Sequence, residues 1–156
     1  MKSKHPRGFE FVNDNFLKEI EAESILKLPT RGTSRSAGYD FVTPNRLVIP
    51  AKQSAFFWSN IKAWMQPDEV LYLHIRSSIG NKGLRIKNTL GVIDADYYGN
   101  PSNDGNIGIG LVNTTGEDII LEAGERVAQG VFHPFLTCGD EPDGERTGGY
   151  GSTGTK

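Results

Sequence analysis

The segment GVIDADYYG, residues 91–99, contains the side chains best suited to chemistry in this sequence. Asp94 and Asp96 are separated by one residue, so both carboxylates would lie on the same face of a strand. Neighbouring carboxylates repel each other, and burial among apolar groups would penalise both. A purely structural role is therefore a poor explanation for the pair. The alternative is a solvated turn rich in acidic residues.

The C-terminal stretch GDEPDGERTGGYGSTGTK has little to bury, and its composition is typical of a mobile tail. Yet Arg146, Tyr150, Ser152 and Thr153 stand there among glycines, a mixture that suits a phosphate chain. Glycine backbones approach anions closely, hydroxyl groups donate hydrogen bonds, and a guanidinium binds two oxygens at once. Considered alone, the stretch fits a phosphate-binding arm and a flexible tail equally well.

Composition limits the classes of protein to consider. The chain has 156 residues, enough for one domain with its own core, and 37% hydrophobic and 23% charged residues are ordinary for a soluble protein. A net charge of -2 makes direct binding to nucleic acid a poor prediction. The single cysteine, Cys138, excludes an internal disulfide, and no apolar run reaches membrane-spanning length. We expect a cytoplasmic protein without membrane contact.

The elements that must position these side chains are short strands separated by glycine, proline and asparagine. Many short strands at this spacing predict an all-β sandwich or barrel. One short helix is expected at 78–82, and a weak helical spacing covers 16–25 before Pro29 and Gly32 interrupt it. The strands on either side of Asn88 are expected to form a hairpin. The expected strands are 9–12, 36–42, 46–49, 54–58, 61–65, 70–76, 84–86, 92–93, 107–113, 119–121 and 126–135.

Common ligand-binding patterns are absent from the sequence. It contains no P-loop and no dinucleotide fingerprint, and His5, His74 and His133 lack the spacing of metal ligands. An anionic ligand would therefore be held by local basic residues and backbone amides.

Five short motifs occur in a fixed order, and together they resemble the homotrimeric dUTPase family. One such motif could arise by chance, but five in order make a specific signal. The similarity runs from about Leu28 to the C-terminus. The motifs are AGYD at 37–40, RSS at 76–78, GVIDADYYG at 91–99, GERVAQ at 124–129 and RTGGYGSTG at 146–154.

The resemblance implies a distorted jelly-roll-like β-barrel at 25–137, an N-terminal extension at 1–24, and a mobile glycine-rich arm at 138–156 that closes the active site. It also implies a homotrimer with three shared sites. The reaction would be Mg²⁺-dependent hydrolysis of dUTP to dUMP and pyrophosphate. This activity keeps uracil out of DNA and supplies dUMP for thymidylate synthesis.

The resemblance also assigns roles around the base and sugar. Asp94 would be the general base, since a carboxylate stays ionised at neutral pH. Asn88, with the backbone of Gly91 and Val92, would read the uracil edge in a space too tight for the methyl group of thymine. Tyr97 would lie beneath the deoxyribose, where a 2′-hydroxyl would lose its hydration; the alternative is core packing. Tyr98 would be structural.

The remaining roles concern the triphosphate. Asp40 would hold metal-bound waters, and Arg76 would serve either the ligand or a subunit contact. Arg126 is expected on the face opposite Gln129, in a contact between subunits. Tyr150 would stack on uracil in place of the family's usual phenylalanine. The expected phosphate contacts are Ser77, Ser78 and Gln129, together with the arm residues Arg146, Gly149, Gly151, Ser152 and Thr153.

Two segments depart from the family pattern. RTGGYG has one residue fewer between arginine and aromatic than the commoner form, so the reach of Arg146 is in question. SSIGNKGL also has one residue fewer than usual, which leaves any role for Lys82 open. Two other functions stay possible: deamination of dCTP on the same fold, and nucleotide-dependent binding without catalysis. A regulatory protein partner could coexist with activity, but nothing in the sequence identifies one.

Overall fold

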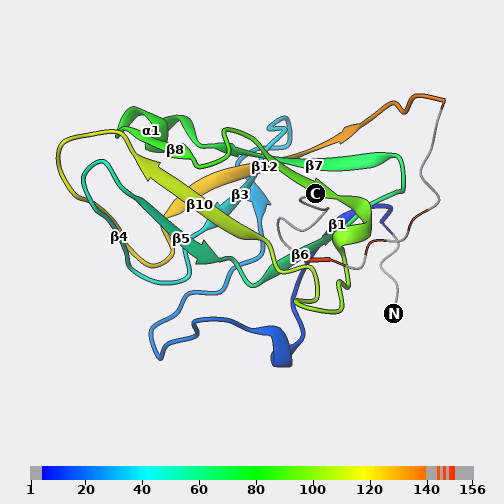
Figure 1. Cartoon of the computed structure of the whole chain (residues 1–156), viewed down its shortest axis with the longest axis horizontal. Helices are drawn as coiled ribbons and strands as arrows, with labels where there is room; N and C mark the ends of the chain where they lie inside the picture. The colour runs from blue at the N-terminus through cyan, green and yellow to red at the C-terminus, as the bar shows by residue number, and fades with distance from the viewer. Residues whose placement is uncertain (1–4, 140–143, 145, 147, 150–156) are drawn as a thin grey trace.

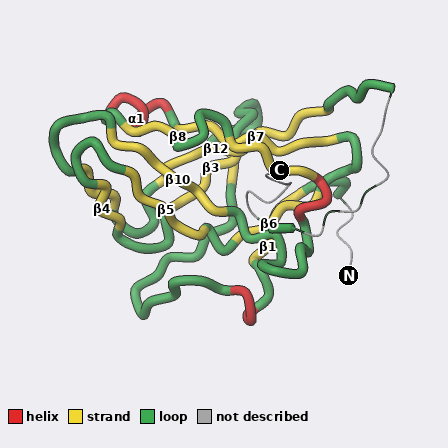
Figure 2. Tube along the Cα trace, viewed as in Figure 1, coloured by secondary structure: helices red, strands yellow, loops and turns green. Residues whose placement is uncertain are grey.

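Short antiparallel strands form most of this chain (Figures 1 and 2). The structure is a computed structural model that describes residues 5–139, 144, 146, 148 and 149. One α-helix, α1, covers Ser77–Asn81 within this part of the chain. The strands are β1 (Gly8–Phe11), β2 (Thr30–Arg31), β3 (Tyr39–Val42), β4 (Leu47–Ile49), β5 (Ser54–Trp58), β6 (Ile61–Trp64), β7 (Glu69–Ile75), β8 (Leu84–Ile86), β9 (Gly91–Asp94), β10 (Gly108–Asn113), β11 (Ile119–Leu121) and β12 (Arg126–Pro134).

The strands form one large sheet and three small ones. The large sheet has the order β2-β3-β12-β7-β9, and β5-β10-β8, β1-β6 and β11-β4 make up the others. The buried core draws on both main sheets, with Phe41 and Leu71 from the large sheet and Leu111 from β10. Alternation along β7 buries Leu71 and Leu73 and leaves His74 exposed, as expected for a strand with one face on the core. The all-β prediction is confirmed.

The N-terminal helix expected at 16–25 is wrong. A single 3-10 turn covers Asp14–Phe16, and the backbone after it is not helical. The N–H of Lys18 donates to the side chain of Asn60 at 2.8 Å, and Glu19 has a φ of 55°, outside the helical range. A distant polar side chain therefore takes the hydrogen bond that a helix would have used.

The hairpin expected around Asn88 is also wrong. Strand β8 pairs with β10, whereas β9 pairs with β7 in the large sheet. The segment between them is a crossing from one sheet to the other, closed by a turn in which the Thr89 N–H donates to the Ile86 carbonyl at 3.0 Å. Since local sequence cannot say which strand is the partner, this difference depends on the tertiary structure.

Two further boundaries differ from the expectation. Strand β2 forms in the segment expected only to break a helix, and Arg31 pairs there with Tyr39. The strand expected at 36–42 begins at Tyr39, because the N–H of Ser36 turns back to the carbonyl of Thr33.

Candidate active site

A polar cavity of about 370 Å³ opens at the edge of the large sheet beside α1. Both oxygens of the Asp40 carboxylate are engaged there by guanidinium groups. Arg76 Nε forms an ion pair with Oδ1 at 2.9 Å, and Arg126 donates from Nη1 to Oδ2 at 3.3 Å. The cavity thus presents two fixed cations and uncharged donors, a set that suits phosphate oxygens. It is lined by Gly32, Ser36, Gly38, Asp40, Arg76, Ser77, Ser78, Arg126 and Gln129.

Arg126 lies on the same side of β12 as Gln129, which corrects the prediction that it points the other way. Three positions apart in a regular strand, the two side chains would point to opposite faces. The pairing of β12 with β3 shifts register between Arg126 and Ala128, as in a β-bulge. The irregularity changes the alternation, so Arg126 joins the cavity. Sequence alternation alone could not reveal it.

Ser77, Ser78 and Gln129 all line this cavity, as their predicted common role requires. Gly38 makes room for Gln129, because a Cβ added at Gly38 would lie 2.4 Å from Gln129 Oε1. Lys82 points its charge elsewhere, with its Nζ 2.8 Å from Glu125 Oε1. Burial raises the pKa of Glu125, but hydrogen bonds from Lys82 and from a backbone N–H together lower it by more. The net shift of the pKa is therefore downward.

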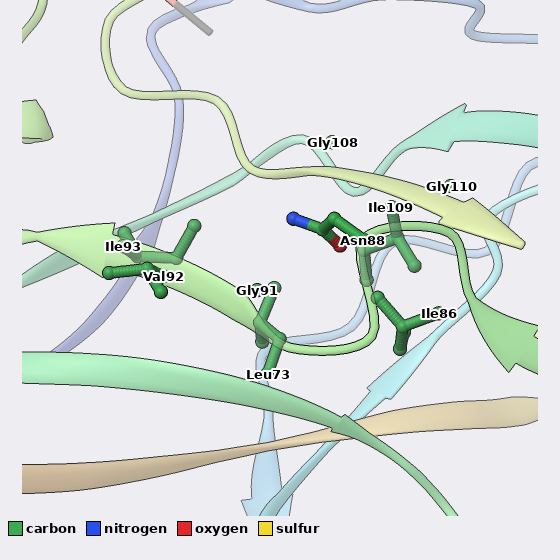
Figure 3. A pocket seen from close by; sticks show the side chains of 9 residues that line it. All are labelled: Leu73, Ile86, Asn88, Gly91, Val92, Ile93, Gly108, Ile109 and Gly110. Carbon is green, nitrogen blue, oxygen red and sulfur yellow. The ribbon is translucent and has the colours of Figure 1, made fainter. Parts of the chain in front are cut away.

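Asn88 stands at the crossing between the two main sheets, above a small apolar cavity (Figure 3). The cavity encloses about 30 Å³, room for about two water molecules. Gly91 and Val92 of β9 line one side, and Gly108 and Gly110 of β10 line the other. The predicted base-reading groups are therefore together, but the cavity as it stands is too small for a nucleobase.

Asp94 and Asp96 do not share one face of a strand. Asp94 ends β9, and Asp96 lies in a 3-10 helix that covers Ala95–Tyr97. Both carboxylates nevertheless meet Arg146: its Nη1 lies 2.9 Å from Asp94 Oδ2 and 3.5 Å from Asp96 Oδ1. The Asp94 side chain is 52% exposed, whereas that of Arg146 is only 13% exposed. In this structure Arg146 of the arm therefore contacts Asp94, the predicted general base.

Tyr97 is almost fully buried, with 4% of its surface exposed. Its hydroxyl donates to the carbonyl of Asn106 at 2.7 Å and accepts from Asn103 Nδ2 at 2.7 Å. The Arg146 guanidinium carbon lies 5.1 Å from the ring centroid, so the arm covers the ring. Sequence reasoning missed the two asparagines, although NDGN at 103–106 is a recognisable turn signal.

Tyr98 points away from Tyr97 toward the N-terminal segment. Its hydroxyl donates to Glu10 Oε1, and this bond, with partial burial and the charges of Glu10 and Asp104, raises the pKa of Tyr98 to about 12. Lys62 Nζ lies 5.0 Å from the ring centroid of Tyr98. Glu10 and Lys62 are thus the partners of Tyr98 in the structural role expected for it.

The described part of the arm lies against the loop that follows Tyr98. Asn100 Nδ2 donates to the Gly148 carbonyl at 2.7 Å. A Cβ at Gly149 would lie 2.6 Å from Ser102 Oγ, so the arm approaches this loop closely. The predicted site residues Tyr150, Gly151, Ser152 and Thr153 lie outside the described residues.

The polar cavity and Asp94 lie at opposite ends of β7 within one chain. Gln129 pairs with His74, and Asp94 pairs with Val70. Four residues along a strand span roughly 13 Å, and β12 and β9 are also on opposite sides of β7. A base and the phosphorus it serves must be joined by one ordered water, so the two groups of one chain do not form a single site.

Comparison with known proteins identifies the family. A family model described as dUTPase matches residues 25–153. The chain belongs to the dUTPase family. The deoxyuridine 5'-triphosphate nucleotidohydrolase of Lactococcus lactis is 43% identical over 152 residues, which cover 95% of this chain and 97% of that protein. The match is therefore to the whole protein.

Solved structures of the family have the same fold. A dUTPase from Streptococcus mutans has a TM-score of 0.74 and 44% identity, over 85% of this chain and 99% of that one. A dUTPase mutant from phage phi11 of S. aureus, described with a structural Mg(II) ion, has a TM-score of 0.67 and 20% identity over 88% and 96% of the two chains. The second likeness supports the fold alone.

Two features are absent from the part of the chain that the structure describes. No group of three or more His, Cys, Asp or Glu side chains in this part of the chain could hold a metal ion directly. No helix among the same residues is long and apolar enough to cross a membrane.

Proposed function

We propose that this chain hydrolyses dUTP to dUMP and pyrophosphate. Family membership supports the reaction, and the observation that carries it to the site is the contact between Arg146 and Asp94. A guanidinium is a preferred partner of phosphate oxygens. When the triphosphate takes this guanidinium, the Asp94 carboxylate loses its arginine and becomes free to bind water beside the substrate.

The chemical step needs one base and one water. The Asp94 carboxylate would accept a proton from water as the water oxygen attacks the α-phosphorus. The bond from the α-phosphorus to the bridging oxygen then breaks, and pyrophosphate leaves with the electron pair. Arg76, Arg126 and Gln129, which line the polar cavity, would hold the phosphate oxygens while negative charge moves to the leaving group.

Mg²⁺ fits this site only through its own waters and the substrate. Each oxygen of Asp40 is already paired with an arginine, so the carboxylate suits an ion that keeps most of its hydration shell. Bound to the triphosphate, Mg²⁺ would neutralise part of its charge. Asp40 would orient the metal-bound waters and the two guanidinium groups.

Selection for the base and for the sugar would come from different segments. The cavity beneath Asn88 would have to widen to accept uracil, and the added methyl group of thymine would require a larger opening still. The ring of Tyr97 would be exposed to the deoxyribose once Arg146 leaves it. A 2′-hydroxyl against that ring would lose hydration without gaining a partner.

The separation of Asp94 from the polar cavity within one chain supports a homotrimer with shared active sites. Because Asp94 and Gln129 of one chain lie at opposite ends of β7, the phosphate cavity of one subunit would be completed by the Asp94 segment of another. Light scattering gives the mass directly, and a monomer with full activity would contradict this arrangement. The cytoplasmic location remains a prediction.

The decisive experiment measures pyrophosphate release with Mg²⁺ from dUTP, dTTP, dCTP and UTP in parallel. We expect release from dUTP alone. Replacement of Asp94 by Asn should keep dUTP binding and lower turnover by at least about 100-fold, the usual effect of losing a general base. Ammonia release from dCTP would indicate the deaminase alternative, and binding of dUTP without turnover would indicate a binding protein.

A further inference from the structure

The loop of residues 100–106 contacts Tyr97, whose ring is the proposed surface for the deoxyribose. Its Asn106 carbonyl and Asn103 amide both bind the Tyr97 hydroxyl. Gly105, with a φ of 81°, packs so closely that a Cβ would lie 2.6 Å from the Tyr97 carbonyl oxygen. Any movement of this loop would therefore be transmitted directly to the ring.

The loop is itself fastened by a buried charge. Asp104 Oδ2 accepts from Lys62 Nζ at 2.7 Å and from the backbone N–H of Asn13 at 2.8 Å. Lys62 and Asp104 are 5% and 6% exposed. Removal of one donor from a buried carboxylate is costly, because water cannot replace it. The N–H of Asn13 is thus a specific link between the N-terminal segment and the loop.

A second link runs through two buried asparagines. Asn106 Oδ1 accepts from the N–H of Asn60 at 3.0 Å, and its amide donates to the Phe16 carbonyl at 3.4 Å. Asn60 in turn exchanges hydrogen bonds with the backbone of Lys18. Strand β1 brings these groups together by pairing with β6, as Figure 1 shows. Residues 8–18 therefore contact the loop at two independent points.

We propose that residues 8–18 position Tyr97 for the rejection of ribonucleotides. They hold the 100–106 loop in place, and this loop sets the position and tilt of the Tyr97 ring on which the sugar would lie. The inference rests on the proposed function, since it assumes that the sugar lies on Tyr97. Its physical basis is that a discriminating surface works only when the groups behind it are rigid. A ring free to recede would leave room and water for a 2′-hydroxyl.

Asn13 allows a specific test, because its backbone N–H alone makes the hydrogen bond from this residue to Asp104. Its φ of -59° suits proline, so Asn13→Pro removes the N–H that reaches Asp104 without straining the backbone at that residue. Asn13→Ala is the matched control, since it keeps the N–H and removes a side chain that makes no capping hydrogen bond. Both variants should fold, because Asn13 is exposed and is not part of the buried core.

The first readout is the ratio of kcat/KM for dUTP to kcat/KM for UTP. We expect Asn13→Pro to lower this ratio about tenfold, the change that corresponds to losing one hydrogen bond to a charged group. Asn13→Ala should leave it unchanged. A merely structural role would lower the thermal midpoint but leave the ratio alone, so equal ratios in the two variants would overturn the proposal.

The second readout does not depend on activity. Amide hydrogen exchange in residues 100–106 should be about tenfold faster in Asn13→Pro than in Asn13→Ala. Equal exchange would overturn the lock itself. If the parent protein releases no pyrophosphate from dUTP, the proposed function fails, and exchange alone decides whether residues 8–18 hold the loop. Should Asn13→Pro not fold, Asp104→Asn weakens the same link, and Asn suits the φ of 58° at that position.

Discussion

Gly38 shows how a missing side chain can shape a binding site. The Gln129 side chain occupies the space where a Cβ on Gly38 would be, and so it reaches the cavity that contains Arg76 and Arg126. The glycine in AGYD is therefore explained by the glutamine in GERVAQ, two motifs that are far apart in the sequence.

Gly38→Ala should displace Gln129 and weaken the hold on the phosphate chain. We expect kcat/KM for dUTP to fall by about tenfold, roughly the value of a hydrogen bond to a charged group. Stability should change little, because a flexible side chain can swing aside. Gly116→Ala is the control, since no atom lies within 4 Å of its added Cβ. Equal loss of activity in both variants, measured by steady-state kinetics, would contradict this account.

At the scale of elements, an irregularity in β12 matters more than the strand itself. Sequence alternation correctly identifies β12, but the register shift near Arg126 decides which side chains face the cavity. The same holds for the N-terminus, where hydrogen bonds to Asn60 replace the helix that local spacing favours. Each local pattern was overruled by a partner distant in sequence.

The ion pair between Arg7 and Glu69 should make the attachment of the N-terminal segment depend on pH. The hydrogen bond from Arg7 lowers the pKa of Glu69 below its ordinary 4.5, against the opposing effect of burial. A lowered carboxyl pKa contributes stability that is present above pH 4.5 and is lost as the pH falls through the folded-state value.

Glu69→Gln should therefore lower the thermal midpoint at pH 6 to 7, and the difference from the parent should shrink as the pH falls below about 4.5. Gln keeps an oxygen for the N–H of Gln66, which donates to Glu69 at 3.0 Å. Glu117→Gln, at an exposed turn, is the matched control and should show no such trend. Scanning calorimetry from pH 3 to pH 7 gives both curves. A difference that grows toward low pH would contradict the assignment.

At the scale of the whole molecule, the C-terminal arm lies outside the buried core. The buried core extends to Ala128, and Phe132 is the last partly buried residue packed against it. The described contacts beyond residue 143 lie on the surface around Asp94, Asp96, Tyr97 and Asn100.

Truncation after Asp143 should leave a folded protein, which we expect to be the proposed trimer, that binds dUTP weakly. It should turn dUTP over at least about 100-fold more slowly, because the arginine proposed to bind the phosphates is lost. Light scattering measures assembly, and pyrophosphate release measures activity. Lys27→Gln, at an exposed position, serves as a variant control in the full-length chain. Loss of the trimer on truncation would show that the arm is structural instead.

The sequence alone determined the strand pattern, the short helix and the residue types of the site. Alternation of apolar and polar side chains is local, and motif residues such as Asp94, Asp40 and Gln129 can be read without knowing their neighbours. It also supported the family, because five motifs in one order carry more information than any single one.

Only the tertiary structure decided which of these side chains meet. It brought Arg126 beside Gln129, placed Arg146 on Asp94, and connected residues 8–18 to the loop beneath Tyr97. It also separated Asp94 from the polar cavity of the same chain. These outcomes depend on strand pairing, on register shifts and on hydrogen bonds between residues many positions apart. Local sequence cannot determine such contacts, because their free energy arises only when the segments pack together.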